Sequence, residues 1–242
     1  MENFSPPYDF RKGTVLLVNK PLTWTSFDVV NKIRYTLKHK LGIKKIKVGH
    51  AGTLDPLATG LLIVCTGKYT KRIDSIQVQN KTYTGSIMLG KTTESFDAEH
   101  EPNATFPTDH ITSELLEKTR HQFIGDIQQF PPHFSAIKVD GIPLYKLARK
   151  GIKKEIKARP VHISKFDLTE ERMPEVDFLV DCSKGTYIRS LANDYGKALD
   201  SGGYLSKLCR TAIGDYKLED AWELEDLLEY IKNEHVVVEP TS

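Results

Sequence analysis

The segment from Glu175 to Cys182 constrains the fold most, because its apolar side chains recur at every second position. The alternating apolar residues are Val176, Phe178, Val180 and Cys182. A period of two indicates a β-strand with one buried face. Such a strand requires neighbouring strands and a layer that covers its apolar side. We therefore expect a domain that is dominated by a sheet.

Other segments complete this expectation. Apolar or β-branched runs predict strands at residues 13–18, 61–66, 81–89 and 205–213, with further strands at about 155–169 and two more at 128–139 on either side of Pro131-Pro132. Helical spacing predicts helices at 27–41, 113–123, 144–150, 186–199 and 223–231. Ser113 is a candidate N-cap for the second of these helices. Polar segments at 91–110 and 140–158 are the best candidates for excursions that contact a ligand.

The first predicted helix has start and stop signals at both ends. Thr25 or Ser26 can cap its N-terminus after the break at Pro21, and Gly42 fits its C-terminal end. Its apolar residues recur with a helical period while lysines and an arginine occupy the other faces. This pattern predicts an amphipathic helix that presents a basic surface.

Composition excludes several classes of protein. Among 242 residues, apolar runs such as Leu61 to Cys65 are far shorter than the roughly 20 residues that span a bilayer. The N-terminus lacks the pattern of a secretory signal, so we expect a cytoplasmic protein without membrane contact. The three cysteines are far apart and the eight histidines show no ligand spacing. We therefore expect reduced thiols, no metal site and no cofactor.

The charge distribution points to a polyanionic partner. Residues 218–242 hold eight acids and one lysine, which leaves a net charge of +9 on residues 1–217. Residues 32–47 carry seven lysines and arginines and no acid, and residues 146–159 carry seven against one glutamate. Either run alone is typical of a solvated face. Two such runs in one chain favour contact with a phosphate backbone.

The segment from Gly49 to Gly60 is the most distinctive motif. Its sequence, G-H-A-G-T-L-D-P-L-A-T-G, places Asp55 in a glycine-rich turn. The residues alone favour a structural role, in which Asp55 caps a local amide beside Pro56. Together with Leu61 and Leu62, however, this string closely resembles the catalytic motif of the TruB family of tRNA pseudouridine synthases.

Further matches follow in the order found in that family. They are Val18 to Pro21, Lys81 to Tyr83, Leu89-Gly90, Phe130 to Gly141, Cys182 to Arg189 and, more weakly, Leu205 to Arg210. The resemblance covers residues 13–217 and implies an α+β fold, a single mixed domain built on a mainly antiparallel sheet flanked by helices. It implies an N-terminal tail at residues 1–12 and a catalytic domain at 13–217. Residues 218–242 would form an acidic helix and tail, with no room for the C-terminal PUA domain of many bacterial members.

The resemblance also implies roles for individual residues. Asp55 would be the nucleophile, Tyr83 would stack on the flipped uracil and accept the C5 proton, and Arg189 would pair with the Asp55 carboxylate. His50 would help to displace the bases of the RNA, Lys20 would support the site, and Leu208 would line the base pocket. For Lys20 and Leu208, ordinary structural roles are equally expected.

The implied reaction is conversion of uridine 55 in the T-loop of tRNA to pseudouridine. It needs no cofactor, because a carboxylate can add to C1′ or to C6 of the target nucleotide. The implied partner is the T-loop and T-stem of tRNA, bound by a monomer without a protein partner. Two alternatives remain open: a non-catalytic RNA-binding or tRNA-folding protein on the same scaffold, and a nucleoside or glycoside hydrolase, for which no second carboxylate is identifiable.

Overall fold

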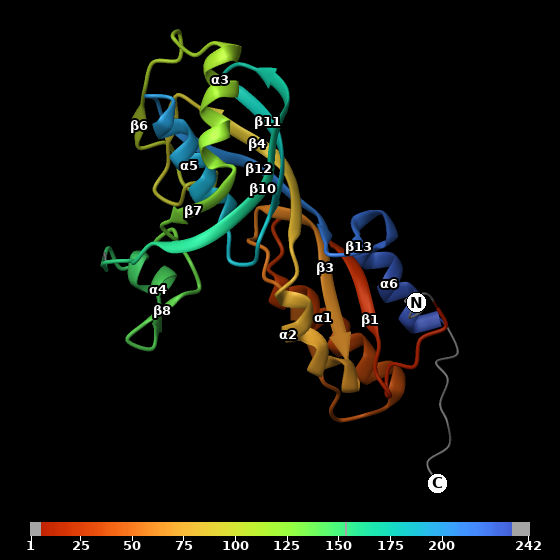
Figure 1. The fold of residues 1–242 in the computed structure, drawn as a ribbon. Helices are drawn as coiled ribbons and strands as arrows, with labels where there is room; N and C mark the ends of the chain where they lie inside the picture. The colour runs from red at the N-terminus through yellow and green to blue at the C-terminus, as the bar shows by residue number, and fades with distance from the viewer. Residues whose placement is uncertain (1–5, 153, 234–242) are drawn as a thin grey trace. The chain divides into compact units, whose positions relative to one another are not determined.

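The computed structural model describes residues 6–152 and 154–233, which divide into two compact units (Figure 1). Unit 1 contains residues 1–81 and 209–242, and unit 2 contains residues 82–208. Strand β12 (Gly203–Ile213) contributes its first six residues to unit 2 and its last five to unit 1. Within the described ranges, no helix is long and apolar enough to cross a membrane.

Unit 1 is built on a sheet with the strand order β14-β1-β3-β12. These strands are β14 (Trp222–Glu223), β1 (Val15–Lys20), β3 (Ala58–Thr66) and the end of β12, while β2 (Val48–Ala51) pairs with β3 and β13 (Tyr216–Lys217) pairs with β12. Strands β1 and β3 are antiparallel, and their register places Lys20 opposite Gly60. The ends of both strands therefore meet at the turn that carries Asp55.

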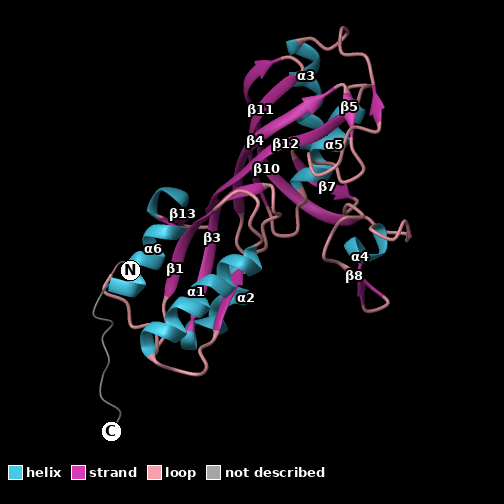
Figure 2. Cartoon of the chain, turned by 180° about the vertical axis from the view of Figure 1, so that it is seen from behind, coloured by secondary structure: helices cyan, strands magenta, loops and turns pink. Residues whose placement is uncertain are grey.

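Helices cover both faces of this sheet. On one face, α1 (Ser26–Leu41) and α6 (Leu224–Asn233) enclose a core with Leu16 and Val18 of β1, and Figure 2 shows the two helices beside these strands. On the other face, η1 (Gly67–Arg72) and α2 (Ile73–Gln77) pack against Leu61, Ile63 and Cys65 of β3. Strand β3 is therefore buried on both sides, which explains its continuous apolar run.

Unit 2 is a sheet with the strand order β12-β4-β11-β10-β7. Its strands are β4 (Lys81–Leu89), β11 (Glu175–Cys182), β10 (Arg159–Arg172) and β7 (Gly125–Gln129). Helices α3 (Ser113–Arg120) and α5 (Ile188–Ala198) belong to this unit, with η2 (His121–Phe123) after α3. The ring of Phe166 in β10 lies 6.2 Å from the ring of Phe178 in β11 and 5.3 Å from the ring of Tyr195 in α5, measured between centroids, so an aromatic cluster joins helix to sheet.

Two excursions leave the sheet of unit 2. One is the hairpin β5 (Lys91–Thr92) and β6 (Ala104–Thr105). The other is the hairpin β8 (Lys138–Val139) and β9 (Ile142–Pro143), which leads into α4 (Leu144–Ala148), as Figure 1 shows. The remaining short helix of the described chain is η3 (Leu218–Asp220) in unit 1.

The structure confirms the α+β class with a mainly antiparallel sheet. Strand β3 pairs antiparallel with β1 and β2, β10 does so with β7 and β11, and β12 does so with β13, whereas β1 and β14 are parallel. The structure also confirms α1, which begins after a capping box formed by Thr25 and Asp28 and ends at Gly42 in the left-handed conformation. Strand β11 has the predicted alternation of buried and half-buried residues.

Several details of the sequence prediction were wrong. The cap of α3 is Thr112 and not Ser113, because the Thr112 hydroxyl accepts a hydrogen bond from the Leu115 amide at 3.2 Å. The strand expected from residue 128 begins at Gly125 and ends at Gln129, since prolines cannot donate to a sheet ladder. Helix α2 was missed because it has only five residues.

The ends of the chain were only partly anticipated. Tyr8 and Phe10, within the expected N-terminal tail, are buried in the core of unit 1 that contains α1 and α6. Residues 6–12 are therefore part of the folded unit. Helix α6 confirms a helix in the acidic C-terminal segment, and the expected tail from residue 234 lies outside the described residues.

Candidate active site

Asp55 lies in the turn between β2 and β3 of unit 1, and its side chain is half-buried. The turn is closed by a hydrogen bond from the Ala58 amide to the Asp55 carbonyl at 3.1 Å. Gly52 and Gly60 on either side of it have φ angles of +92° and +98°, a region that favours glycine. The glycines of the motif therefore allow the tight turn that sets the position of the Asp55 backbone, from which the carboxylate extends.

The N-terminus of α1 anchors this turn. The Ser26 hydroxyl accepts a hydrogen bond from the Leu54 amide at 2.8 Å and donates to the Leu54 carbonyl at 3.2 Å. The Thr23 amide donates to the Pro56 carbonyl at 2.9 Å. Both residues next to Asp55 are thus tied to the segment that precedes and begins α1. Ser26 was expected only as a helix cap, and the sequence gave no signal for its contact with the turn.

Lys20 supports the same turn from the end of β1. Its side chain is fully buried, and its Nζ donates to the carbonyl oxygens of Pro21 at 2.8 Å, Trp24 at 2.5 Å and Pro56 at 3.3 Å. Burial lowers the pKa of Lys20 to about 8, although the negative charge of Asp55 opposes the shift. The ammonium group is therefore a positive charge inside the protein that acts on Asp55.

Arg210 of β12 is the largest of the fully buried side chains and holds the other side of the turn. Its Nε donates to the Leu61 carbonyl at 2.9 Å and its Nη2 to the Gly52 carbonyl at 3.0 Å, with a longer contact of 3.4 Å from Nη1 to the Thr53 carbonyl. A Cβ on Gly60 would lie 2.3 Å from the Arg210 carbonyl oxygen, so this close approach requires glycine. This role was not predicted from the sequence. The one available signal was a single arginine within a segment with a strand pattern.

His50 lies in β2, the strand that leads into the turn, and is half-buried. Burial lowers the pKa of His50, and the positive charge of Arg210 lowers it further. The imidazole is therefore neutral at pH 7. Its Nδ1 atom is buried and has no hydrogen-bond partner in the described structure.

Arg189 lies in the first turn of α5 in unit 2 and is buried. Its Nη1 donates to the Ser95 carbonyl at 3.2 Å, and its Nη2 donates to the Phe134 carbonyl at 2.9 Å. Nη1 also lies 3.6 Å from Oδ2 of Asp97, which is itself buried. The guanidinium group is thus held in one orientation by two backbone carbonyls and one carboxylate.

Asp97 was missed by sequence reasoning, because residues 91–110 were expected to form a polar loop. Its Oδ1 atom accepts hydrogen bonds from the Ser95 hydroxyl at 2.6 Å and from the Glu99 amide at 3.0 Å. Its carbonyl accepts from the Thr93 hydroxyl at 2.6 Å. These hydrogen bonds fix the orientation of the Asp97 carboxylate that faces Arg189.

Tyr83 and Leu208 are the other two predicted site residues of unit 2. Tyr83 lies in β4 with 9% of its surface exposed, and Leu208 is half-buried in β12, the next strand of the sheet. The two strands approach closely, because a Cβ on Gly85 would lie 2.2 Å from the Lys207 carbonyl oxygen.

The predicted site residues divide between the two units. Lys20, His50 and Asp55 belong to unit 1, whereas Tyr83, Arg189 and Leu208 belong to unit 2. The three residues of unit 1 surround one turn, and the convergence of Asp55 with Tyr83 and Arg189 stays a prediction. In the part of the chain that the structure describes, no group of three or more His, Cys, Asp or Glu side chains could hold a metal ion.

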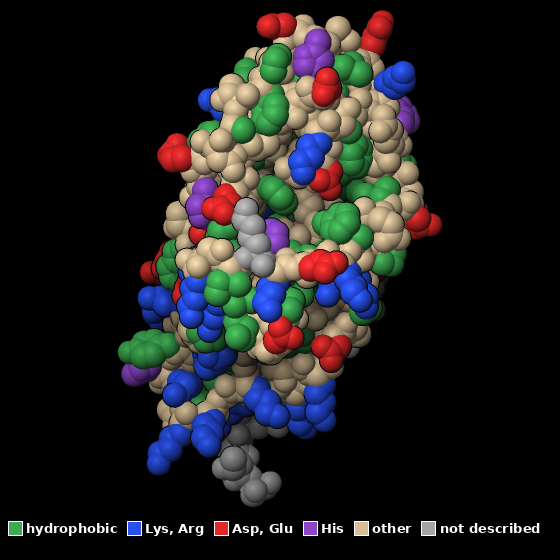
Figure 3. All heavy atoms as spheres, turned by 90° about the vertical axis from the view of Figure 1, so that its left-hand side faces the viewer, with side chains coloured by type: hydrophobic (Ala, Val, Ile, Leu, Met, Phe, Trp, Pro, Cys, Tyr) green, Lys and Arg blue, Asp and Glu red, His purple; other side chains and the backbone are tan. Residues whose placement is uncertain are grey.

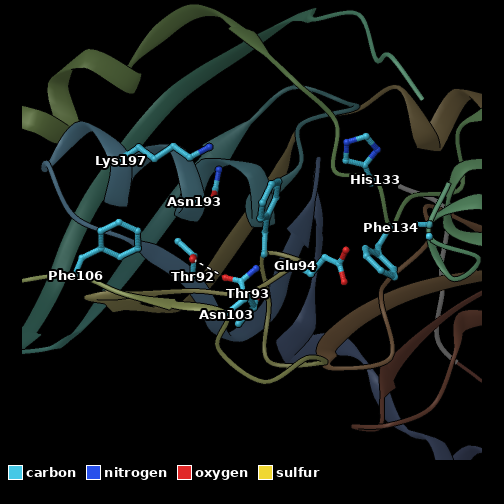
Figure 4. A pocket seen from close by; sticks show the side chains of 12 residues that line it. Thr92, Thr93, Glu94, Asn103, Phe106, His133, Phe134, Asn193 and Lys197 are labelled. Carbon is cyan, nitrogen blue, oxygen red and sulfur yellow. Dashed lines mark hydrogen bonds between the residues drawn. The ribbon is translucent and has the colours of Figure 1, made fainter. Parts of the chain in front are cut away.

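A pocket of about 370 Å³ lies beside the Arg189 network in unit 2 (Figure 4). Three phenylalanines and several polar groups line it, including Asn193 and Lys197 of α5. Thr93 and Phe96 form part of its wall, while the intervening Ser95 holds Arg189. The segment from Thr93 to Asp97 therefore serves both the pocket and the guanidinium group.

Comparison with known proteins gives consistent results. Residues 38–188 match the model of the TruB family pseudouridylate synthase N-terminal domain. A tRNA pseudouridine synthase B of Phocaeicola vulgatus is 55% identical over 228 residues, which are 94% of this chain and 97% of that protein. Another of the same name, from Flavobacterium johnsoniae, is 54% identical over 219 residues, or 90% of this chain and 96% of that protein.

Solved structures are also similar. A chain in the crystal structure of a Cbf5-Nop10-Gar1 complex matches with a TM-score of 0.69 and 28% identity over 92% of this chain. A chain in an H/ACA RNP bound to a substrate RNA containing 2'-deoxyuridine matches with a TM-score of 0.66 and 26% identity over 91% of this chain. The present chain spans about 55% and 54% of those two chains.

Proposed function

The chain belongs to the TruB family of pseudouridylate synthases, and from this premise we propose that it isomerises uridine 55 in the T-loop of tRNA with Asp55 as its nucleophile. The observation that carries the proposal is the fixed turn around Asp55. Lys20, Ser26 and Arg210 hold its backbone from three sides. Such a turn places one carboxylate at a defined position before the substrate binds, which lowers the entropic cost of attack.

The reaction moves a base without adding or losing atoms. The Asp55 carboxylate attacks either C1′ of the ribose or C6 of the uracil, and the bond from N1 to C1′ breaks. The base rotates, C5 bonds to C1′, and the carboxylate leaves. The proton on C5 departs to a base and N1 ends with a proton, so the product is an isomer of the substrate.

Two residues of unit 2 are proposed to take part in the reaction, Arg189 at the nucleophile and Tyr83 at the base. Arg189 would pair with the Asp55 carboxylate and keep it ionised, as an opposite charge within a few ångströms does. Its contacts with Asp97, Ser95 and Phe134 support this proposal, because they orient the guanidinium group in advance. Tyr83 would stack on the uracil and accept the C5 proton, and Leu208 would line the pocket of the base.

The target uridine must leave the T-loop before the reaction, at a cost of a few kcal/mol in unstacking. We propose that His50 takes part in displacing the bases. Its neutral imidazole, which follows from the lowered pKa, suits insertion into a stack better than a charged ring would. Lys20 would act through the backbone of the turn, because its ammonium group faces three carbonyl oxygens.

Specificity for tRNA would come from the fold of the T-arm and from the two basic runs at 32–47 and 146–159, which would contact phosphates. We further propose that residues 13–217 form the catalytic region and that the protein acts as a monomer in the cytoplasm. None of the residues to which we assign a role is proposed to bind a cofactor or a metal.

The position of the reaction can be tested with tRNA transcripts that carry tritium at C5 of uridine. The protein should release tritium from a transcript with uridine 55 and release none above background when that nucleotide is replaced by cytidine. Equal release from both transcripts would show that another uridine is the target. No release from either would contradict the proposed activity.

A further inference from the structure

The outward side of α1 carries four residues, three exposed and one half-buried, that have no role in the proposed chemical step, although one of them, Lys38, belongs to the basic run that would contact phosphates. Phe27, Asn31, Tyr35 and Lys38 recur at intervals of four, four and three, so they lie along one line of the helix, which we call the α1 stripe. Phe27 is 62% exposed and Tyr35 is 63% exposed. Two large aromatic side chains on one such line differ from the scattered exposed apolar residues that are usual on a protein surface.

The α1 stripe is surrounded by positive charge. Lys32 is exposed on the same helix, and the exposed lysines that follow α1 are Lys44, Lys45 and Lys47. The one acid within α1 is Asp28, whose carboxylate accepts hydrogen bonds from the Thr25 amide and hydroxyl in the capping box. Figure 3 shows Lys and Arg side chains gathered in the lower part of the view, below the height of the α1 label in Figure 1. This surface is therefore complementary to a polyanion.

The stripe begins next to the turn of Asp55. Ser26, the neighbour of Phe27, exchanges two hydrogen bonds with Leu54. At a rise of 1.5 Å per residue, the eleven steps from Phe27 to Lys38 extend for about 16 Å along the helix. A ligand that reaches Asp55 and continues along α1 must therefore be a long, negatively charged molecule.

We infer that the α1 stripe binds the shallow minor groove of the RNA helix that adjoins the target loop; this inference rests on the proposed function. Double-stranded RNA is recognised through 2′-hydroxyls and phosphates across that groove. The Oδ1 atom of Asn31 accepts a hydrogen bond from Arg34 at 2.6 Å, which leaves its Nδ2 group to donate to a 2′-hydroxyl. The Tyr35 hydroxyl can also hydrogen-bond to a 2′-hydroxyl, the Phe27 ring can pack on a ribose, and lysines can contact phosphates. The stripe then distinguishes RNA from DNA at a distance from the reacting base.

A protein partner fits this surface less well. The core of a protein interface is depleted in charged residues, and lysine in particular is rare there. On α1 the aromatic residues are separated by Asn31 and bordered by lysines, so they do not form a continuous apolar patch. The charge and the spacing together favour RNA.

The inference can be tested by measuring the binding of three T-arm hairpins whose loops are identical ribonucleotides. Their stems carry 2′-hydroxyl, 2′-deoxy or 2′-fluoro sugars, and the fluoro stem retains the A-form geometry without the hydroxyl donor. We expect the full-length protein to bind the hydroxyl stem about 3- to 10-fold more tightly than the fluoro stem, as one or two hydrogen bonds would produce. Equal affinity for these two stems would overturn the inference.

Substitutions locate the effect on α1. Tyr35→Phe removes only the hydroxyl group that would hydrogen-bond to a 2′-hydroxyl. It should therefore lower the affinity for the hydroxyl stem and reduce the preference for this stem over the fluoro stem. Lys38→Gln should weaken all three complexes and decrease the slope of log affinity against log salt by about 0.7 to 0.9. The control is Lys118→Gln on the exposed side of α3, which should change neither quantity.

Other outcomes are equally decisive. If Tyr35→Phe weakens the three hairpins by the same factor, or if it changes the oligomeric state without affecting RNA binding, the stripe does not read the groove. Tritium release by the unsubstituted protein from the hydroxyl hairpin is measured in parallel. Absence of release would contradict the proposed function, whereas a lost sugar preference with normal release would contradict only this inference.

Discussion

Replacing Lys20 by methionine tests how the turn of Asp55 is held. Methionine fills a similar apolar volume but removes the ammonium group that donates to the carbonyl oxygens of Pro21, Trp24 and Pro56. Two effects oppose each other at neutral pH: the buried carbonyl groups lose a donor, and the cost of burying a positive charge disappears. The pH dependence separates them.

The sign follows from the pKa of Lys20, which falls from 10.5 in the unfolded chain to about 8 in the folded protein. Between these values the unfolded state binds more protons, so the contribution of Lys20 to the unfolding free energy rises with pH. Below pH 8, the cost of burying the protonated Lys20 side chain lowers the unfolding free energy by its full amount of about 3 kcal/mol. From pH 7.5 to pH 9.5 the unsubstituted protein should regain about 2 kcal/mol of it.

The assay is urea unfolding followed by circular dichroism at pH 7.5, 8.5 and 9.5. The difference in unfolding free energy between the unsubstituted protein and Lys20→Met should increase by about 2 kcal/mol over this range, because groups common to both proteins cancel. Lys118→Met, at an exposed position of α3, is the matched control and should give a constant difference. A Lys20→Met difference that stays constant to within about 0.5 kcal/mol would refute the assignment of a buried, charged Lys20.

Three further predictions concern two supports of the site and one residue of its proposed chemistry. Arg210→Met leaves the Leu61 and Gly52 carbonyls without their donor, so it should lower the unfolding free energy by about 3 kcal/mol in urea unfolding, and a loss below 1 kcal/mol would argue against an anchoring role. Asp97→Ala removes the carboxylate beside buried Arg189 and should cost about 3 to 5 kcal/mol in the same assay, whereas unchanged stability would show that the pair is dispensable. Tyr83→Phe should keep tRNA affinity in filter binding and slow tritium release by about 10²- to 10⁴-fold, and an unchanged rate would leave Tyr83 a packing role.

The elements that could be predicted from sequence are those whose signals are local. Helix α1 combines a capping box, a helical apolar period and a C-terminal glycine, and the structure agrees with all three. Strand β11 alternates because one face of it is buried. By contrast, β7 was misplaced, because its start at Gly125 is set by pairing with β10, from Ile163 opposite Gly125 to Arg159 opposite Gln129, and this pairing is not visible in the segment itself.

The candidate site shows the same division. The Gly49 to Gly60 motif identified Asp55 through a family resemblance, since the composition of the turn alone favours a structural aspartate. The residues that hold the turn were less visible. Ser26 contacts Leu54, which is 28 residues away in the sequence, and Arg210 contacts Gly52, which is 158 residues away. Contacts of this kind depend on tertiary packing, for which a single sequence contains no direct signal.

Asp55→Asn tests the central proposal most directly, because the amide retains the size of the side chain and removes the nucleophilic carboxylate. The measurement is tritium release from a C5-labelled tRNA transcript, compared with the unsubstituted protein at equal occupancy of tRNA and after circular dichroism has shown equal folding. The account predicts that Asp55→Asn binds the transcript and releases no tritium above background. Release at the rate of the unsubstituted protein would contradict it.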